Sequence, residues 1–342
     1  MKSGPTWGLQ SRLPPDVYDR LVGWHTRVKP LVPWGSLTLG VSGLLLMERT
    51  PDRAWLVAAA AIIALALAVG FVALSRVETE DLSENHTWLL RCAHMGALLG
   101  TQSLLQVSLF FALPYYLKAS SLLLGHLVFD ALLLATAAVI LWDPAYFAAM
   151  RHTSTRAGVQ AVVSLATLNV ILPIVGLSNR ASLLAAAAIT MAGLPLLDPH
   201  PRWRVVGVRT LVSVALGTLM LFGLGSFVPP APLQLVRAAM GTQIRDHQLT
   251  DPQSTLTGRP RQLVCFTAIA APRGLKDRIV HVWSHDEQQV DAIEVKIRGG
   301  RTQGFRTWSA KKNLGPRASG TWTCRVQTRS GQQLGRTQLV IR

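Results

Sequence analysis

The sequence is short of charged residues, and of acidic residues above all. Only 15% of its 342 residues are Asp, Glu, Lys or Arg, whereas about 25% is usual in soluble globular proteins. Within that small set, 34 basic residues outnumber 18 acidic ones, which gives a formal net charge of +16. So little solvated surface with a basic excess is typical of apolar membrane spans flanked by Lys and Arg.

Several patterns typical of enzymes are also missing. There is no Gly-x-Ser-x-Gly nucleophile elbow, and RGGRTQG at 298–304 lacks the Lys-Ser/Thr and the following helix of a phosphate loop. His281 and His285 have a spacing that suits a metal site on a helix, but they fall in a predicted strand and turn. We therefore favour a non-enzymatic protein and expect no catalytic residue, no metal and no cofactor.

Long apolar runs fill the first two thirds of the chain. Each is near the length needed to cross about 30 Å of hydrocarbon, and a run in lipid must pair its own backbone polar groups, as a helix does. The sequence thus predicts a transmembrane all-α bundle over 31–228. About seven transmembrane helices are expected, at roughly 31–47, 54–74, 92–117, 119–142, 158–177, 181–197 and 205–228.

The charges between these runs predict an orientation. Loops on the N-terminal side of seven spans contain eleven Lys and Arg, against four on the other side, which favours a cytoplasmic N-terminus. Residues 1–30, which show no cleavable signal peptide, form either a cytoplasmic amphipathic helix at the membrane surface or an ordinary soluble helix. We expect a multi-pass protein of the bacterial inner (cell) membrane with a periplasmic C-terminal domain.

Polar side chains inside the predicted spans are candidate functional residues. Asp130 lies near the middle of its span, with His126 one helical turn away on the same face. Asn169 and Gln102 are placed mid-span in neighbouring segments. Two interpretations stay open: a site for a proton or small solute in a transporter, or a hydrogen-bonded clamp that joins helices.

The hydrophobic period changes after a connector at 229–260, in which LQLVRAAMGTQI (233–244) is compatible with a short helix. From 261 to 342, apolar and polar residues alternate in short segments, as in AIEVKIR at 292–298 and GTWTCRVQT at 320–328. Alternating strands with Gly-rich turns predict an all-β, immunoglobulin-like antiparallel sandwich.

Three motifs of this tail carry a family resemblance: HVWSH at 281–285, RTWSAK at 306–311 and GTW at 320–322. Through them, residues 261–342 resemble the bacterial domain of unknown function 2914 family. The preceding region resembles an uncharacterised multi-span membrane domain that is fused to it. The resemblance implies a domain boundary near 260 and no particular activity.

Of the three cysteines, Cys92 is expected as a free thiol, and the other two fall in predicted strands of the tail. With Trp283 between them, Cys265 and Cys324 follow the Cys–Trp–Cys order of immunoglobulin-type sandwiches. They form either a disulfide, which a periplasm permits, or two buried free thiols. Trp322 stands two residues before the second Cys, where a Tyr is usual, so the Tyr hydroxyl bond of that fold is expected to be absent.

The stretch IRGGRTQGFRTWSAKK at 297–312 has no acidic residue, and from 261 onward fifteen Lys and Arg face five Asp and Glu. If Phe305 packs inward, Arg306 and Trp308 point outward together. With Arg301 and Lys311, they would form a cationic face that binds an anionic glycan, a lipid head group or an acidic protein of the envelope.

The alternative for this stretch is a solvated basic surface. Nucleic acid is not expected as a partner, because the predicted compartment holds little of it. The sequence thus favours a membrane protein, in contact with lipid, whose sandwich binds an anionic envelope component or partner protein. The runner-up is a proton-coupled or small-solute transporter that uses His126 and Asp130.

Overall fold

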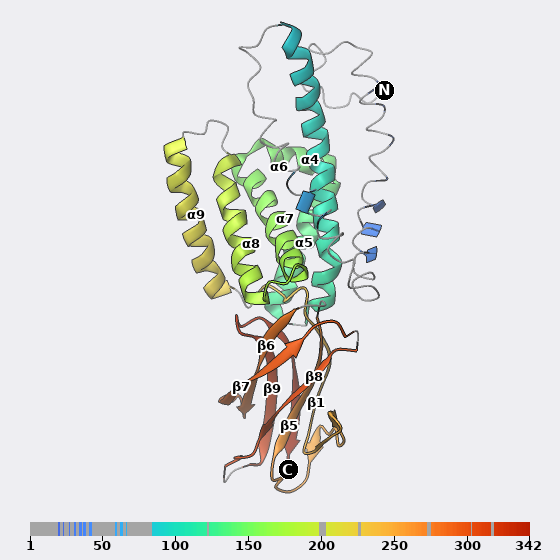
Figure 1. Ribbon diagram of the computed structural model, residues 1–342, viewed down its shortest axis with the longest axis vertical. Helices are drawn as coiled ribbons and strands as arrows, with labels where there is room; N and C mark the ends of the chain where they lie inside the picture. Colours follow the sequence, from blue (N-terminus) through green and yellow to red (C-terminus); the bar gives the residue numbers. More distant parts are fainter. Residues whose placement is uncertain are drawn as a thin grey trace.

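The chain folds into a group of helices with a β-sandwich extending from one end (Figure 1). The computed structural model describes isolated positions between residues 20 and 66, and then 84–121, 123–197, 203–224, 227–271, 275–301, 303–315 and 318–342, with the backbone alone for some helical residues such as 84–99. The helices of this part are α4 (Glu84–Ala119), α5 (Leu124–Leu141), α6 (Asp143–Arg151), α7 (Thr153–Ile174), α8 (Asn179–Gly193), the 3₁₀ helix η3 (Leu194–Leu197) and α9 (Trp203–Leu224).

The prediction of about seven transmembrane helices is wrong. The described residues contain six α-helices, of which α5 and α7 are long and apolar enough to cross a membrane. The run predicted at 181–197 holds only the fifteen residues of α8 before η3, and fifteen residues rise about 22 Å, short of the hydrocarbon thickness. The predicted spans 31–47 and 54–74 lie outside the described residues, apart from isolated positions.

An additional short helix, α6, occupies a segment that the prediction treated as a loop. Pro144 lies in its first turn, where the missing N–H costs nothing but where α5 cannot continue, because Pro breaks the helical hydrogen-bond ladder. The predicted span 119–142 ends at this break, but hydropathy does not reveal that a short helix follows it.

The C-terminal part is a β-sandwich, as the alternating pattern predicts. A five-stranded sheet in the order β4-β10-β9-β6-β7 faces a three-stranded sheet in the order β1-β5-β8. Neighbours are antiparallel apart from the short pair β4–β10. The strands are β1 (Gln234–Gly241), β2 (Ile244–Arg245), β3 (Gln248–Leu249), β4 (Thr255–Leu256), β5 (Leu263–Ala270), β6 (Lys276–His285), β7 (Gln288–Arg298), β8 (Phe305–Lys311), β9 (Gly320–Thr328) and β10 (Gln333–Ile341).

Strand β1 lies in the segment predicted as a connector, whose composition is compatible with a short helix. It pairs along its length with β5, from Gln234 opposite Ala270 to Gly241 opposite Val264. Tertiary pairing decides the conformation here, as it often does for strands. The sandwich therefore includes residues well before 261.

The hairpin β2–β3 covers the outer face of the smaller sheet. Its Leu249 packs against Val264, Phe266 and Ala268 of β5, while the alternate residue Cys265 faces the core between the sheets. Strand β5 is thus buried on both faces, which explains why its sequence is continuously apolar rather than alternating.

The core between the sheets contains the predicted disulfide. Cys265 on β5 and Cys324 on β9 are bonded, with their Cα atoms 6.3 Å apart, and Trp283 is fully buried in the same cluster. The indole Nε1 of Trp322 donates to the carbonyl of Ala318 at 2.9 Å. This hydrogen bond to the upstream backbone resembles the one that the tyrosine hydroxyl makes in immunoglobulin sandwiches. The tryptophan therefore replaces the tyrosine without loss of a hydrogen bond at this position.

The helices and the sandwich meet at the N-terminus of α8. The carboxylate of Asp277, on β6, accepts a hydrogen bond from the backbone N–H of Asn179 at 2.8 Å. The Asn179 side chain donates to Gln332, whose own amide donates to the carbonyl of Val228 at 2.9 Å. An acidic group is favourable at a helix N-terminus, where N–H groups lack partners, so a sandwich residue caps a helix of the helical part.

Candidate functional site

A groove on the sandwich brings together two of the arginines singled out by the sequence. It encloses about 640 Å³ and is lined by His247, Gly300, Arg301, Gln303, Gly304, Phe305 and Arg306. These residues come from the β7–β8 loop, from the start of β8 and from the turn between β2 and β3. The volume falls within the usual range of small-ligand sites, and no lining residue is acidic.

The loop that forms one wall is held against β5 by its backbone. The N–H of Gly300 donates to the carbonyl of Ala271 at 3.0 Å, and the N–H of Gly304 donates to that of Arg301 at 3.0 Å. Gly304 has a φ of +80°, and a Cβ there would lie 2.8 Å from the backbone of Ala268. Only glycine fits this approach, so the loop position and its arginine are fixed by local backbone geometry.

The two arginines of the groove lack acidic partners within the described residues. Arg301 is exposed, with its guanidinium carbon 5.5 Å from the centroid of the Phe305 ring, an arrangement that fixes a cation over an aromatic face. Phe305 itself packs inward against Ile269, so Arg306 faces outward, as the alternation of the strand requires. Two guanidinium groups therefore remain available to one anion.

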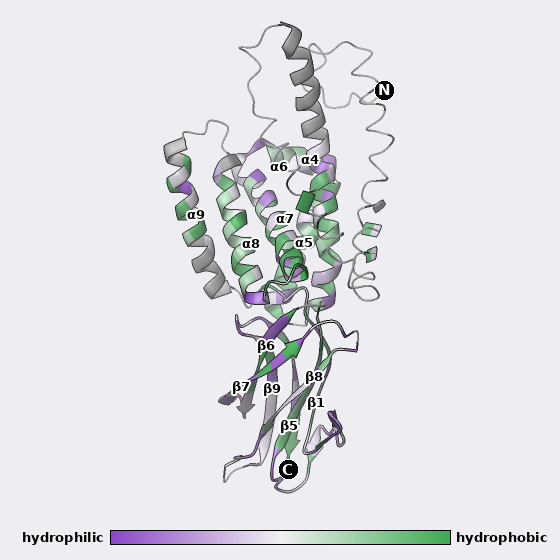
Figure 2. Cartoon of the chain, viewed as in Figure 1, coloured by the Kyte–Doolittle hydropathy of each residue, from purple (hydrophilic) through white to green (hydrophobic). Residues whose placement is uncertain are grey.

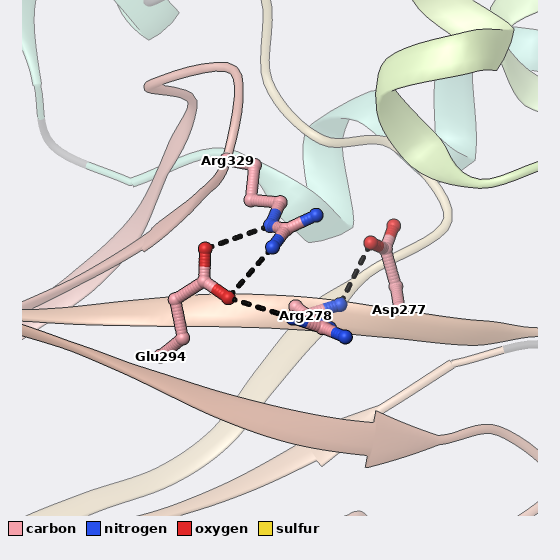
Figure 3. Close-up of polar contacts among 4 residues, drawn as sticks. All are labelled: Asp277, Arg278, Glu294 and Arg329. Atoms are coloured by element: carbon pink, nitrogen blue, oxygen red, sulfur yellow. Dashed lines mark hydrogen bonds and ion pairs between the residues drawn. The ribbon is translucent and has the colours of Figure 1, made fainter.

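Three other cations of the sandwich, Arg278, Lys311 and Arg329, are paired with carboxylates. Glu294 accepts two hydrogen bonds from Arg329, at 2.8 and 2.7 Å, and one from Arg278 at 3.1 Å (Figure 3); these bonds, with Arg329 contributing most, lower the pKa of the glutamate. Lys311 lies 2.8 Å from the carboxylate of Asp291, and its hydrogen bond lowers the pKa of that aspartate. Lys311, predicted as a ligand contact, lies outside the groove lining at the other end of β8.

Trp308 occupies the outward face with Arg306, but its ring is not freely exposed for stacking on a ligand. It is half-buried beneath the β2–β3 hairpin, in contact with the cluster around Leu249, and its ring centroid lies 5.5 Å from that of His247 in an edge-on arrangement. Trp308 thus supports His247, which in turn lines the groove.

His247 is a groove residue that sequence reasoning missed. Asp246 and His247 have φ values of 49° and 59°, as both central residues of a type I′ hairpin turn require. An Asp-His pair between short apolar segments is a weak signal for such a turn. The approach of this turn to Arg306, far along the chain, follows only from the hairpin folding over β5.

Among the helices, three of the four predicted polar residues cluster. His126 is fully buried, and its Nδ1 lies 3.1 Å from both the backbone nitrogen and the hydroxyl of Ser121. Asn169 donates to the Tyr116 hydroxyl at 3.0 Å, and the Tyr116 ring packs on Phe129, the neighbour of Asp130. Within the described residues, His126 Nε2, Asp130 Oδ1 and Asn169 Oδ1 are buried without a hydrogen-bond partner.

Gln102 lies elsewhere. It donates to the carbonyl of Ile140 at 2.8 Å and to the carboxylate of Asp143 at 3.0 Å, where α5 ends and α6 begins. Ten residues of helix separate Ile140 from Asp130, a rise of about 15 Å. Gln102 satisfies the end of a helix and does not share a layer with Asp130.

One group in the described residues has metal-ligand atoms close together: those of Cys265, His281 and Cys324 lie within 4.8 Å of one another. Both cysteines are consumed by the disulfide. The ring nitrogens of His281 contact the hydroxyls of Ser309 at 2.9 Å and Thr267 at 3.2 Å. All three side chains thus have partners within the core, and they are not available as metal ligands.

Fold and site together define a helical protein that carries a β-sandwich with a cationic groove. The chain belongs to the family of unknown function DUF5924, whose model matches residues 14–264. A second model, the protein of unknown function DUF2914, matches residues 276–341, which confirms the resemblance of the tail. A search of curated proteins found no match. The first match includes β1 and the second covers β6–β10, so the smaller sheet, β1-β5-β8, joins strands from both.

Proposed function

We propose that this is a membrane-anchored protein whose sandwich binds an anionic ligand through Arg301 and Arg306. One observation carries the proposal: two guanidinium groups share a groove of about 640 Å³, and among the described residues they have no acidic partner and no carboxylate lines the groove. Guanidinium is the side chain best matched to carboxylate and phosphate oxygens. Gln303 and His247 add further polar contacts, and the Phe305 ring holds Arg301 in place.

The helical surface supports a membrane location. Helix α5 has a mean hydropathy of 2.1, yet only 33% of it is buried, whereas an apolar helix in the core of a soluble protein would be mostly buried. Its outward side chains include Leu124, Leu127, Val128, Leu132, Leu134 and Leu141. Figure 2 shows how apolar residues dominate the described parts of α5 and α8. Exposed apolar surfaces of this kind are typical of membrane or partner contacts.

The disulfide supports a compartment for the sandwich. Disulfides persist in oxidising environments such as the bacterial periplasm and are rare in the cytosol, and Cys265–Cys324 closes the core between the two sheets. We therefore place the helices in the bacterial inner membrane and the sandwich on its periplasmic side. A cysteine-labelling reporter at the C-terminus that reacts only after the membrane is breached would overturn this placement.

Binding is tested with soluble anions on the full-length protein in a neutral detergent. We expect tripolyphosphate or trigalacturonate to bind in a salt-sensitive manner, and Arg301→Glu with Arg306→Glu to weaken binding on the order of tenfold or more. Lys312→Glu with Arg342→Glu changes the net charge equally at exposed sites outside the groove and should leave binding unchanged. Equal losses in both double variants would reduce the effect to overall charge.

A second function is favoured by the buried atoms in the helices. His126 Nε2 and Asp130 Oδ1 have no partner in the described residues, and buried polar atoms normally find one in protein or water. A proton or small solute that passes between these helices would supply it. In proteoliposomes, Asp130→Asn should abolish uptake, whereas Asp143→Asn, the same change near the other end of α5, should not; failure of the Asp130 variant to accumulate would favour the clamp instead.

A further inference from the structure

The groove lies at the end of the sandwich that faces the helices. Its loop follows β7, whose last residue, Arg298, is paired with Lys276 at the start of β6. The next residue of β6 is Asp277, which accepts a hydrogen bond from Asn179 of α8. Strand β8 enters the sheet from this side, with Phe305 opposite Ile269, and leaves at the far end with Lys311 opposite Leu263.

Several cations without an ion pair lie at the same end. Within the described residues, five cations there have no ion pair: Lys276, Lys296, Arg298, Arg301 and Arg306. The two acidic residues nearby are already engaged, Asp277 by backbone N–H groups and Glu294 by two arginines. The far end has acidic residues beside its cations Lys312 and Arg342: Asp286 and Glu287 lie in the β6–β7 turn, and Asp291 lies close by, opposite Trp283.

The apolar surface of the helices continues to this junction. Leu124, the first residue of α5, is 76% exposed, and Leu127 and Val128 follow it on the surface. Gly125 packs closely against Phe227, at the start of the segment that enters the sandwich. If hydrocarbon covers these side chains, its boundary runs near the junction. The lipid head groups then occupy the next roughly 5–7 Å, at the level of the unpaired cations.

We infer that the groove binds the phosphate of an anionic membrane lipid, with Arg301 and Arg306 donating to the phosphate oxygens. This inference rests on the proposed anion-binding function and adds the source of the anion. Positive charge beside the groove attracts the anionic membrane surface; it comes from Lys276, Lys296 and Arg298. The groove itself holds one head group by bidentate hydrogen bonds. A soluble acidic glycan would gain nothing from a groove that faces the bilayer.

The experiment is native mass spectrometry of the full-length protein from a neutral detergent, titrated with phosphatidylglycerol, with phosphatidylcholine and, separately, with trigalacturonate and inorganic phosphate. We expect saturable phosphatidylglycerol binding that is tighter than binding of either soluble anion. Arg301→Glu with Arg306→Glu should weaken it on the order of tenfold, and Lys312→Glu with Arg342→Glu should not. Arg301→Gln with Arg306→Gln is a milder pair for the case in which the charge reversal impairs folding.

Three outcomes contradict the inference, and they differ in what survives. Groove-dependent binding of trigalacturonate that is tighter than phosphatidylglycerol binding would retain the anion site but assign it to a glycan. Phosphatidylglycerol binding that is equal in wild-type and groove variants, while the soluble anions lose theirs, would place the lipid elsewhere. If the groove variants change neither phosphatidylglycerol binding nor soluble-anion binding, then the anion-binding function fails as well.

Discussion

His126 in helix α5 and His281 in strand β6 are both fully buried, yet their ring nitrogens differ in what they contact. In the sandwich, both nitrogens of His281 meet hydroxyl groups, and Ser309, one of these partners, also accepts from the indole of Trp283 at 3.0 Å. In the helices, Nε2 of His126 has no partner in the described residues. His281 therefore belongs to a closed network of hydrogen bonds, and His126 to an open one.

The same difference extends to the two regions as wholes. Among the described residues, every buried side-chain nitrogen or oxygen without a hydrogen-bond partner lies between positions 108 and 190, in the helical part. The hydrogen bonding of the sandwich core is therefore complete within the described residues. The helices retain unpaired polar atoms, each of which costs about 1–3 kcal/mol unless water, a solute or further contacts satisfy it.

Among the changes considered, removing the disulfide should destabilise the sandwich most. Cys265→Ala with Cys324→Ala opens a loop with a sequence separation of 59, and the chain-entropy model gives a loss of about 4 kcal/mol in the free energy of unfolding. Hydrogen exchange of the β5 and β9 amides measures it, with Cys92→Ala as the matched control. A loss below about 1 kcal/mol would mean that packing alone maintains the sandwich.

The closed histidine network predicts a pH dependence. Burial lowers the pKa of His281 from 6.5 to about 4, so between these values the unfolded chain binds a proton that the folded one does not. Stability should fall by about 3 kcal/mol as pH drops through this window. His281→Gln should remove this slope and His285→Gln, on the sandwich surface, should keep it; equal slopes in both variants would assign the pH dependence to other groups.

The contact between the two regions should contribute less. Asp277→Ala removes the carboxylate that caps α8 from the sandwich, with an expected loss of about 1 kcal/mol and faster hydrogen exchange in the first turn of α8. Asp286→Ala is the control, because that carboxylate accepts a backbone N–H, that of Thr321, within the sandwich. If both variants leave exchange in α8 unchanged, the cap does not couple the regions.

The smallest effect is expected for an ion pair on the sandwich surface. Lys311→Met removes the partner of Asp291, and pairs that remain in contact with solvent contribute about 1 kcal/mol or less. Thermal unfolding and anion titration should both stay close to wild type. A large loss of anion binding would return Lys311 to the ligand-binding residues and extend the site along β8.

Alternation within strands made the sandwich predictable. In GTWTCRVQT the residues predicted to share a face, Trp322, Cys324 and Val326, are all buried, because side chains of a strand alternate between its two sides. Strand β1 could not be found in the same way, since its conformation depends on pairing with β5 more than twenty residues later. His247 joins Arg306 only through the fold of the hairpin.

The helical part was predictable in composition but not in length or number. Hydropathy located segments that overlap α5 and α7, but it did not reveal helix α6, which follows the end of α5, or the shortness of α8. Likewise, the two arginines of the groove stood out as a charge pattern, while the pairing of Lys311 with Asp291 depends on a cross-strand neighbour that charge counting along the chain does not reveal.

Strand β1 has a practical consequence for anyone who expresses the tail alone. A fragment that begins at 261 or 276, as the domain boundary suggests, lacks the partner of β5 or β5 itself. It would present a long, apolar row of unpaired N–H and C=O groups, and such edges recruit other chains into aggregates. A soluble fragment should start before Gln234.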